Sequence, residues 1–321
     1  MMLIYAGIDE AGYGPMFGPL CVASSVIVLD KYNPEEGEPD MWSMLDHIIC
    51  RKRRDAKHKI AINDSKKLKS SAKNNSLTHL ERGVLTFLSM IEDAIPEIDS
   101  DFFEKVSCKI NLTPWYESST KIPIGNDLNT LRIDAAKLRR ELGKAHIRCP
   151  LMKCTAIDTD AYNKQTKYAK KSSLNFSVAM QHVNQIMQQF GNMHPRIMID
   201  RHGGRIRYRN DLQLCWPEAS IQVLVENKSM SRYRLTHRGN KLTITFASKS
   251  DEKHMPVALA SMLAKYTREL HMIRFNRYFS EEIPNLRPTA GYVQDGRRFL
   301  KEIEPVLVKN GVQRAQLVRS S

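Results

Sequence analysis

Residues 7–15 read GIDEAGYGP, and this stretch decides the fold. It completes an apolar run that begins at residue 3, and a second apolar run, rich in β-branched residues, follows at 20–29. Two such runs separated by glycines and prolines predict two strands joined by a tight turn. The first strand leads into Asp9 and Glu10, and strand ends commonly line the active crevice of α/β sheets.

Outward from this stretch, the hydrophobic spacing predicts alternating strands and helices. The predicted helices cover 77–94, 129–143, 174–189, 256–272 and 296–308. The predicted strands cover 196–200 and 221–225, with a β-hairpin over 231–246 around turn residues 238–240. Such alternation indicates an α/β fold. We expect one domain over 1–321, with an insertion at 98–155, a hairpin insertion at 229–248 and a C-terminal extension at 275–321.

The composition favours a polyanionic partner. Lys and Arg outnumber Asp and Glu by 49 to 35, and the formal net charge is +14. Basic side chains that neutralise phosphates release condensed counterions, so a nucleic acid is the expected partner, although a generally basic surface gives the same numbers. We expect no membrane association and a cytoplasmic protein with reduced cysteines, because no apolar run approaches the length of a bilayer span.

Three carboxylates occupy similar positions. Asp9 and Asp200 each end an apolar strand, and Asp251 precedes a predicted helix. Carboxylates from separate elements that converge on one point provide the hard oxygen ligands of a two-ion site for Mg²⁺. From spacing alone, surface or helix-capping roles for Asp200 and Asp251 are equally good interpretations.

Five blocks, in order, carry a resemblance to a known family. The GIDEAGYGP stretch closely resembles the opening of ribonuclease HII, the type 2 ribonucleases H. The remaining blocks that resemble this family are DSKKL at 64–68, the helix 174–189 leading to Asp200, KSD at 249–251 with the helix after Pro256, and Gly291-Tyr292. The resemblance implies a ribonuclease H-like fold, with a central mixed β-sheet flanked by helices and a C-terminal helical extension.

The resemblance also implies an activity and a site. The activity is hydrolysis of the RNA strand of RNA–DNA hybrids with Mg²⁺ or Mn²⁺ at a two-ion site, leaving a 5′-phosphate and a 3′-hydroxyl. The implied catalytic and metal-binding residues are Asp9, Glu10, Asp200 and Asp251. The implied substrate-binding residues are Gly12, Tyr13, Gly14, Lys66, Lys67, Lys265, Arg268 and Tyr292. No obligate protein partner is expected.

The chain departs from the family at specific points. Position 13 is Tyr where the family normally has Arg or Lys, and the polar loop 201–205 has no counterpart. His202 in that loop is either an exposed residue or a group that assists proton transfer. Two alternatives therefore stay open: a nucleic-acid-binding protein with altered catalysis, and a nuclease of the same fold that acts on structured DNA.

Overall fold

The computed structural model describes all residues except 34, 36, 69–76, 112, 202 and 321. His202 therefore lies outside the described residues. In the part of the chain that is described, seven strands form a central sheet in the order β5-β2-β1-β6-β9-β8-β7. These are β1 (Leu3–Ala11), β2 (Leu20–Leu29), β5 (Ile147–Ile157), β6 (Arg196–Asp200), β7 (Ser220–Glu226), β8 (Met230–His237) and β9 (Asn240–Ala247). A separate parallel pair is formed by β3 (Ile49–Cys50) and β4 (Ile60–Ala61).

The sheet is mixed. β1 pairs antiparallel with β2 and parallel with β6, and β6 pairs parallel with β9. The β2–β5, β9–β8 and β8–β7 pairs are antiparallel. Parallel pairing of β1 and β6 brings their carboxyl ends together, with Ile8 opposite Ile199, so the residues that follow each strand meet at one edge. The expected fold class, a central mixed sheet flanked by helices, is confirmed.

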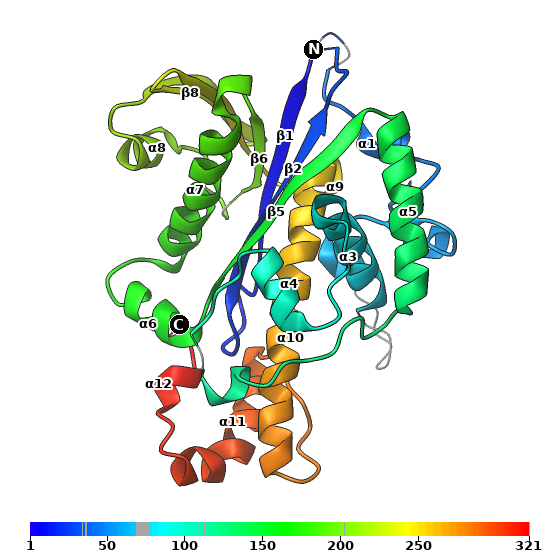
Figure 1. Cartoon of the computed structure of the whole chain (residues 1–321). Coiled ribbons are helices and arrows are strands. Elements are labelled where there is room, and N and C mark those ends of the chain that lie inside the picture. The colour runs from blue at the N-terminus through cyan, green and yellow to red at the C-terminus, as the bar shows by residue number, and fades with distance from the viewer. Residues whose placement is uncertain (34, 36, 69–76, 112, 202, 321) are drawn as a thin grey trace.

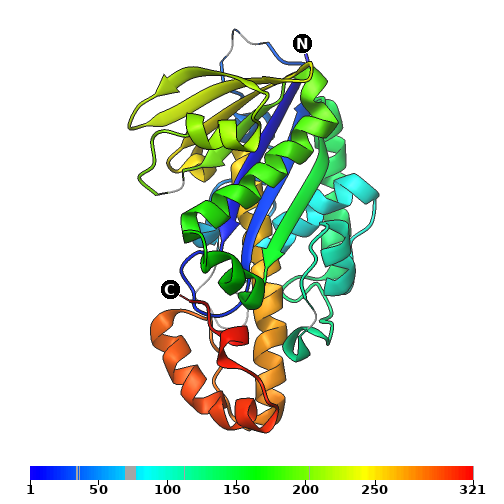
Figure 2. The same ribbon diagram turned by 90° about the vertical axis from the view of Figure 1, so that its left-hand side faces the viewer.

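Helices cover both faces of the sheet (Figure 1). On one face lie α3 (Thr78–Glu92), α5 (Leu128–Lys144) and the first part of α10 (Met255–Glu282). On the other lie α7 (Lys171–Phe190) and α8 (Arg209–Cys215). α10 runs along the sheet and continues past its edge, where α11 (Val293–Lys309) and α12 (Arg314–Leu317) form a third apolar cluster with it (Figure 2). This arrangement confirms a C-terminal helical extension. None of the described helices is long and apolar enough to cross a membrane.

The shorter helices lie between these elements. They are α1 (Met41–Met44), α2 (Ser65–Leu68), α4 (Asp99–Lys105), α6 (Thr159–Thr166) and α9 (Ser250–Lys253), with 3₁₀ turns at Arg53–Asp55, Pro114–Tyr116 and Gly191–Met193. A helix approaches a strand closely at Gly7 of β1, where a Cβ atom would lie 2.2 Å from backbone atoms of Pro256 and Val257. Only glycine permits this contact, which sets the start of α10 directly against β1.

Two boundaries expected from the sequence are wrong. The interval 98–155 is not wholly an insertion, because its last part is most of β5, an edge strand of the central sheet. Pro150 hides this strand in the sequence. It is tolerated because β5 is at the edge and its register with β2 shifts at that point. The hairpin at 229–248 is also no insertion, since β9 pairs with β6 inside the sheet.

Candidate metal centre

The four predicted carboxylates come from three elements that meet at one end of the sheet. Asp9 and Glu10 lie on β1, Asp200 is the last residue of β6, and Asp251 lies on α9. Asp9 is 8% exposed. Burial raises the pKa of Asp9 well above its usual range, and the charges of Glu10, Asp200 and Asp251 raise it further. Separate sequence blocks are thus brought within electrostatic reach of one another.

The pKa values of the other three carboxyl groups are raised too, in each case mainly by burial. Burial raises the pKa of Glu10, and Asp200 adds to this effect. Burial also raises the pKa of Asp200, with a further contribution from Asp64. The pKa of Asp251 is raised to about 6 by burial, then by the charges of Asp64 and Asp200. The cluster therefore concentrates negative charge that few nearby groups compensate.

Hydrogen bonds fix the orientation of these side chains. Asp9 is hydrogen-bonded by Ser261 of α10, and Glu10 by Asn175 of α7. Asp200 Oδ1 accepts a hydrogen bond from the backbone N–H of Ser250, 3.0 Å away. Because α7 and α10 lie on opposite faces of the sheet, Asp9 and Glu10 point to opposite faces, as successive residues of a strand do.

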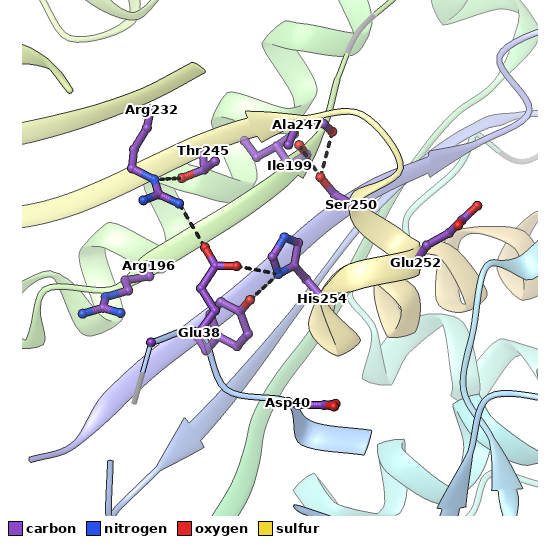
Figure 3. Close-up of polar contacts among 12 residues, drawn as sticks. Glu38, Asp40, Arg196, Ile199, Arg232, Thr245, Ala247, Ser250, Glu252 and His254 are labelled. Atoms are coloured by element: carbon purple, nitrogen blue, oxygen red, sulfur yellow. Dashed lines mark hydrogen bonds and ion pairs between the residues drawn. The ribbon is translucent and has the colours of Figure 1, made fainter. Parts of the chain in front are cut away.

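The turn that carries Asp251 is held from both sides (Figure 3). Ser250 Oγ donates to the carbonyl oxygen of Ala247 at 2.7 Å, while Ile199 O lies 3.4 Å away. After α9, the ring of His254 is hydrogen-bonded through Nδ1 to the Tyr5 hydroxyl. Glu38 lies 3.9 Å from the same nitrogen and 3.0 Å from Arg232. These contacts position α9 against the carboxyl ends of β6 and β9.

The donor set suits a hard divalent cation. Carboxylate oxygens are the ligands that Mg²⁺ and Mn²⁺ prefer, and a divalent ion offsets the repulsion among clustered carboxylates. Within the described ranges, however, no three Asp, Glu, His or Cys side chains are arranged so that they could hold one ion. The fit to a metal ion therefore rests on the chemistry of the donors and on the charge that they share.

The motif at 64–68 is brought to this cluster. Asp64 accepts the backbone N–H of Lys66 at 2.9 Å, and Ser65 of the same motif lies 3.2 Å from Ser261. The charge of Lys66 lowers the pKa of Glu10 and Asp200. Lys67 instead forms an ion pair with Glu252 at 3.0 Å. The sequence predicts Lys66 and Lys67 of this motif as site residues but not Asp64. Only the tertiary structure shows that the charge of Asp64 acts on Asp200 and Asp251.

The predicted pair Lys265 and Arg268 requires a correction. Arg268 is 1% exposed and donates to the carbonyl oxygens of Phe17 and Ala290, both at 3.0 Å, so it does not face a phosphate. Lys265 is largely buried and pairs with Glu269 at 2.7 Å. Spacing along a helix places two residues on one face, but burial of that face depends on segments distant in sequence.

Two buried arginines hold the turn after Glu10. Arg268 contacts this turn through its hydrogen bond to the carbonyl oxygen of Phe17. Arg319 donates hydrogen bonds to the carbonyl oxygens of Gly12 and Gly18. Gly12 has a φ of +84°, and a Cβ atom there would lie 2.7 Å from the Arg268 side chain. Gly14, by contrast, has open space around it. The sequence does not reveal the role of Arg319, because nothing near it indicates a contact with a residue 307 positions earlier.

The two predicted tyrosines border the same turn. Tyr13 is 38% exposed, and the Nζ of Lys171 lies 4.3 Å from its ring centroid. Tyr292 is 53% exposed and follows Gly291, whose carbonyl oxygen accepts the Met16 N–H at 2.8 Å. Both rings are thus available to a ligand near the carboxylate cluster.

The central mixed sheet flanked by helices matches ribonuclease H-like folds. Residues 212–303 match the family model described as Ribonuclease HII, so this part of the chain is similar to ribonuclease HII. The matched segment contains Asp251 and Tyr292; Asp9, Glu10 and Asp200 lie outside it.

Several solved ribonuclease H structures are similar to this chain at low sequence identity. The ribonuclease HII in the PCNA complex from Archaeoglobus fulgidus is 16% identical, with 99% of this chain and 94% of that chain covered and a TM-score of 0.43. Ribonuclease H2 from Pyrococcus horikoshii OT3 is 15% identical, with 99% and 92% covered and a TM-score of 0.41. Bst-RNase HIII in complex with Mn²⁺ is 13% identical, with 99% and 66% covered and a TM-score of 0.41. None of the curated proteins compared with this sequence matches it.

Proposed function

We propose that the protein is a metal-dependent endonuclease that hydrolyses the RNA strand of RNA–DNA hybrids, leaving a 5′-phosphate and a 3′-hydroxyl. One observation carries this proposal. Four carboxylates, from sequence blocks that are far apart, share one electrostatic field at the end of the sheet. Such a concentration of negative charge opposes nucleic-acid binding unless divalent cations offset it. The match of residues 212–303 to ribonuclease HII supports the same activity.

The roles follow from the surroundings of each group. Asp9, Glu10, Asp200 and Asp251 would hold Mg²⁺ or Mn²⁺ as a two-ion site. When bound, these ions activate a water molecule and stabilise the leaving 3′ oxygen. Asn175 and Ser261 orient Glu10 and Asp9 from opposite faces of the sheet.

The substrate contacts follow in the same way. Lys66, whose charge reaches the cluster, provides a cation for the scissile phosphate. The turn 12–14 is proposed to contact the ribose. Gly14 is exposed with open space around it, Gly12 turns the chain at a φ of +84°, and the buried arginines keep the turn in place. Tyr292 borders this turn and is proposed to contact the substrate.

Cleavage assays with a panel of labelled duplexes test the proposal. The panel contains an RNA–DNA hybrid, a DNA duplex with a single ribonucleotide, all-DNA, all-RNA and branched DNA, each with Mg²⁺ or Mn²⁺. We expect cleavage of the ribonucleotide-containing duplexes. Cleavage of branched DNA alone would instead support a nuclease for structured DNA, and tight binding without any cleavage would support a binding protein.

Two variants separate the site from the rest of the surface. Asp9→Asn should reduce cleavage by at least about a hundredfold while hybrid binding is retained, because the carboxylate is needed for the ions and not for the affinity of the strand. Asp46→Asn changes a carboxylate that is 64% exposed and is not among the main groups that shift the pKa values of the cluster, and it should leave the rate unchanged. Retained turnover in Asp9→Asn would remove Asp9 from the metal site.

A further inference from the structure

A groove lies beside the turn 12–14, between α6, the segment 167–171 and residues of the 315–320 stretch. Figure 1 shows α6 and α12 next to each other at this place. The groove has a volume of about 750 Å³, within the size range of ligand sites. It is lined by Tyr162, Asn163, Thr166, Lys167, Tyr168, Ala169, Lys170, Lys171, Ala315 and Ser320. We call it the 167–171 groove.

Its charge is positive. Lys167, Lys170 and Lys171 line the groove, and the described lining contains no acidic side chain. Lys171 is partly buried beside the guanidinium group of Arg319, and both the burial and this like charge lower the pKa of Lys171. An anion in the groove would relieve this repulsion, because it supplies the opposite charge that the lining lacks.

Aromatic rings alternate with these lysines. Tyr168 is 84% exposed, and the Nζ of Lys167 lies 5.5 Å from its ring centroid. The Nζ of Lys171 likewise lies 4.3 Å from the ring centroid of Tyr13. A positively charged groove with exposed aromatic rings is the arrangement that binds single-stranded nucleic acid, in which phosphates meet the cations and bases stack on the rings.

Tyr13 links the groove to the carboxylate cluster, because it contacts Lys171 and lies within electrostatic reach of Glu10. Tyr13 follows Glu10 by three residues, and the charge of Glu10 contributes to the raised pKa of Tyr13 after the effect of burial. A strand that lies over the cluster therefore reaches Lys171 through Tyr13 and continues towards Tyr168. The exposed face of Tyr168 accepts a base most readily when that base is outside a duplex, because stacked neighbours cover the faces of bases inside a duplex.

We propose that the 167–171 groove binds a single-stranded segment that flanks the cleaved part of the substrate. Lys167, Lys170 and Lys171 contact its phosphates, and one unpaired base stacks on Tyr168. The inference rests on the proposed function, because the direction of the bound strand is set by placing the cleaved part of the nucleic acid over the carboxylates. It adds a preference for hybrids with a single-stranded extension over blunt hybrids.

Binding measurements without divalent ions test this preference separately from cleavage. Fluorescence anisotropy in EDTA compares a blunt RNA–DNA hybrid with the same hybrid carrying a short thymidine tail on either strand. We expect at least one tailed hybrid to bind at least about fivefold more tightly, the lower limit for one base stacked on an aromatic ring. Equal affinities for the tailed and blunt hybrids would overturn the proposal.

Variants locate the effect. Tyr168→Ala should abolish the advantage of the tail and Tyr168→Trp should keep it; a tail effect unchanged in Tyr168→Ala would also overturn the proposal. Lys167→Ala with Lys170→Ala should lower the salt dependence of tailed-hybrid binding by about 0.7 in log–log slope for each phosphate that is no longer neutralised. Lys137→Ala on α5 is the matched control, because this lysine is exposed and lies on another part of the surface.

The outcomes for the groove and for the proposed function are distinguishable. A tail effect that depends on Tyr168, combined with no cleavage of any ribonucleotide-containing duplex, would support the groove and reject the activity. Cleavage of hybrids with no tail effect would support the activity and reject the groove. Because Tyr168 is almost fully exposed, its substitution should leave the thermal unfolding temperature unchanged, which a melting curve checks.

Discussion

Replacing Asp251 with Asn should stabilise the metal-free protein while it removes activity. The pKa of Asp251 is raised from 3.8 to about 6, mainly by burial and by the charges of Asp64 and Asp200. When the pKa of a carboxyl group is higher in the folded state than in the unfolded state, its ionisation opposes folding. This cost is absent at a pH below the unfolded-state pKa and grows until the pH reaches the folded-state pKa. The shift corresponds to about 3 kcal/mol, which solvent screening at this partly exposed group reduces to about 1–2 kcal/mol.

The assay is thermal and urea unfolding in EDTA at pH 8 and pH 4. Asp251→Asn should raise the unfolding free energy by about 1–2 kcal/mol at pH 8, or the melting temperature by about 1.5–3 °C, and by almost nothing at pH 4. Asp211→Asn is the control with the opposite sign, because Asp211 has a favourable partner, Arg205, 3.2 Å away. A variant that is less stable than the wild type at pH 8, or a gain that is equal at both pH values, would refute the reasoning.

Mg²⁺ should reverse the order of stability. A ligand that binds only the folded state adds RT ln(1 + [L]/Kd), about 2.7 kcal/mol at a hundred times Kd. The wild type should gain this stabilisation, and Asp251→Asn should gain less because it has one carboxylate fewer. Equal stabilisation of both proteins by Mg²⁺ would place the ions away from Asp251.

Three further predictions concern the surrounding structure. Glu81 is fully buried and accepts hydrogen bonds from Ile124 N (2.6 Å), Gly125 N (2.8 Å) and the Tyr266 hydroxyl (2.9 Å), so Glu81→Gln should cost about 2–3 kcal/mol in urea unfolding. Burial lowers the pKa of His182 to about 4, so stability should fall by up to about 1.4 kcal/mol per pH unit between pH 6.5 and 4, and His182→Gln should flatten that slope in unfolding titrations. Arg319→Met should free the turn that follows Glu10 and reduce kcat at least about tenfold with hybrid binding nearly kept, measured by single-turnover cleavage.

The elements that the sequence predicts well are those with a clear hydrophobic pattern. The run 20–29 is β2 in full, and 196–200 is β6. β5 escapes prediction because Pro150 interrupts it, which the edge position and the register shift permit. The predicted helix 256–272 extends to Glu282 in α10. α10 is buried on most sides, so its sequence shows no polar stripe by which its length could be followed.

The site is predictable to the extent that its residues lie in recognisable blocks. The charges of Glu10, Asp200 and Asp251 reach Asp9, and the charge of Lys66 reaches Glu10. The rest is determined by tertiary contacts, which a single sequence does not display. Arg268 is buried because the turn at Phe17 and the segment at Ala290 close over it. Asp64 adds its charge to the cluster because α2 lies against α10.

The contact of Arg319 with Gly12 has a consequence for the order of events during synthesis. The turn beside Glu10 is translated 307 residues before the side chain that restrains it. A nascent chain can form β1 and β2 early, yet the turn lacks this restraint until residue 319 has emerged from the ribosome. Restraint of the turn is thereby tied to the translation of residue 319, and a ribosome-bound intermediate lacking Arg319 should be folded in its sheet but cleave hybrids at least about tenfold more slowly than the full chain.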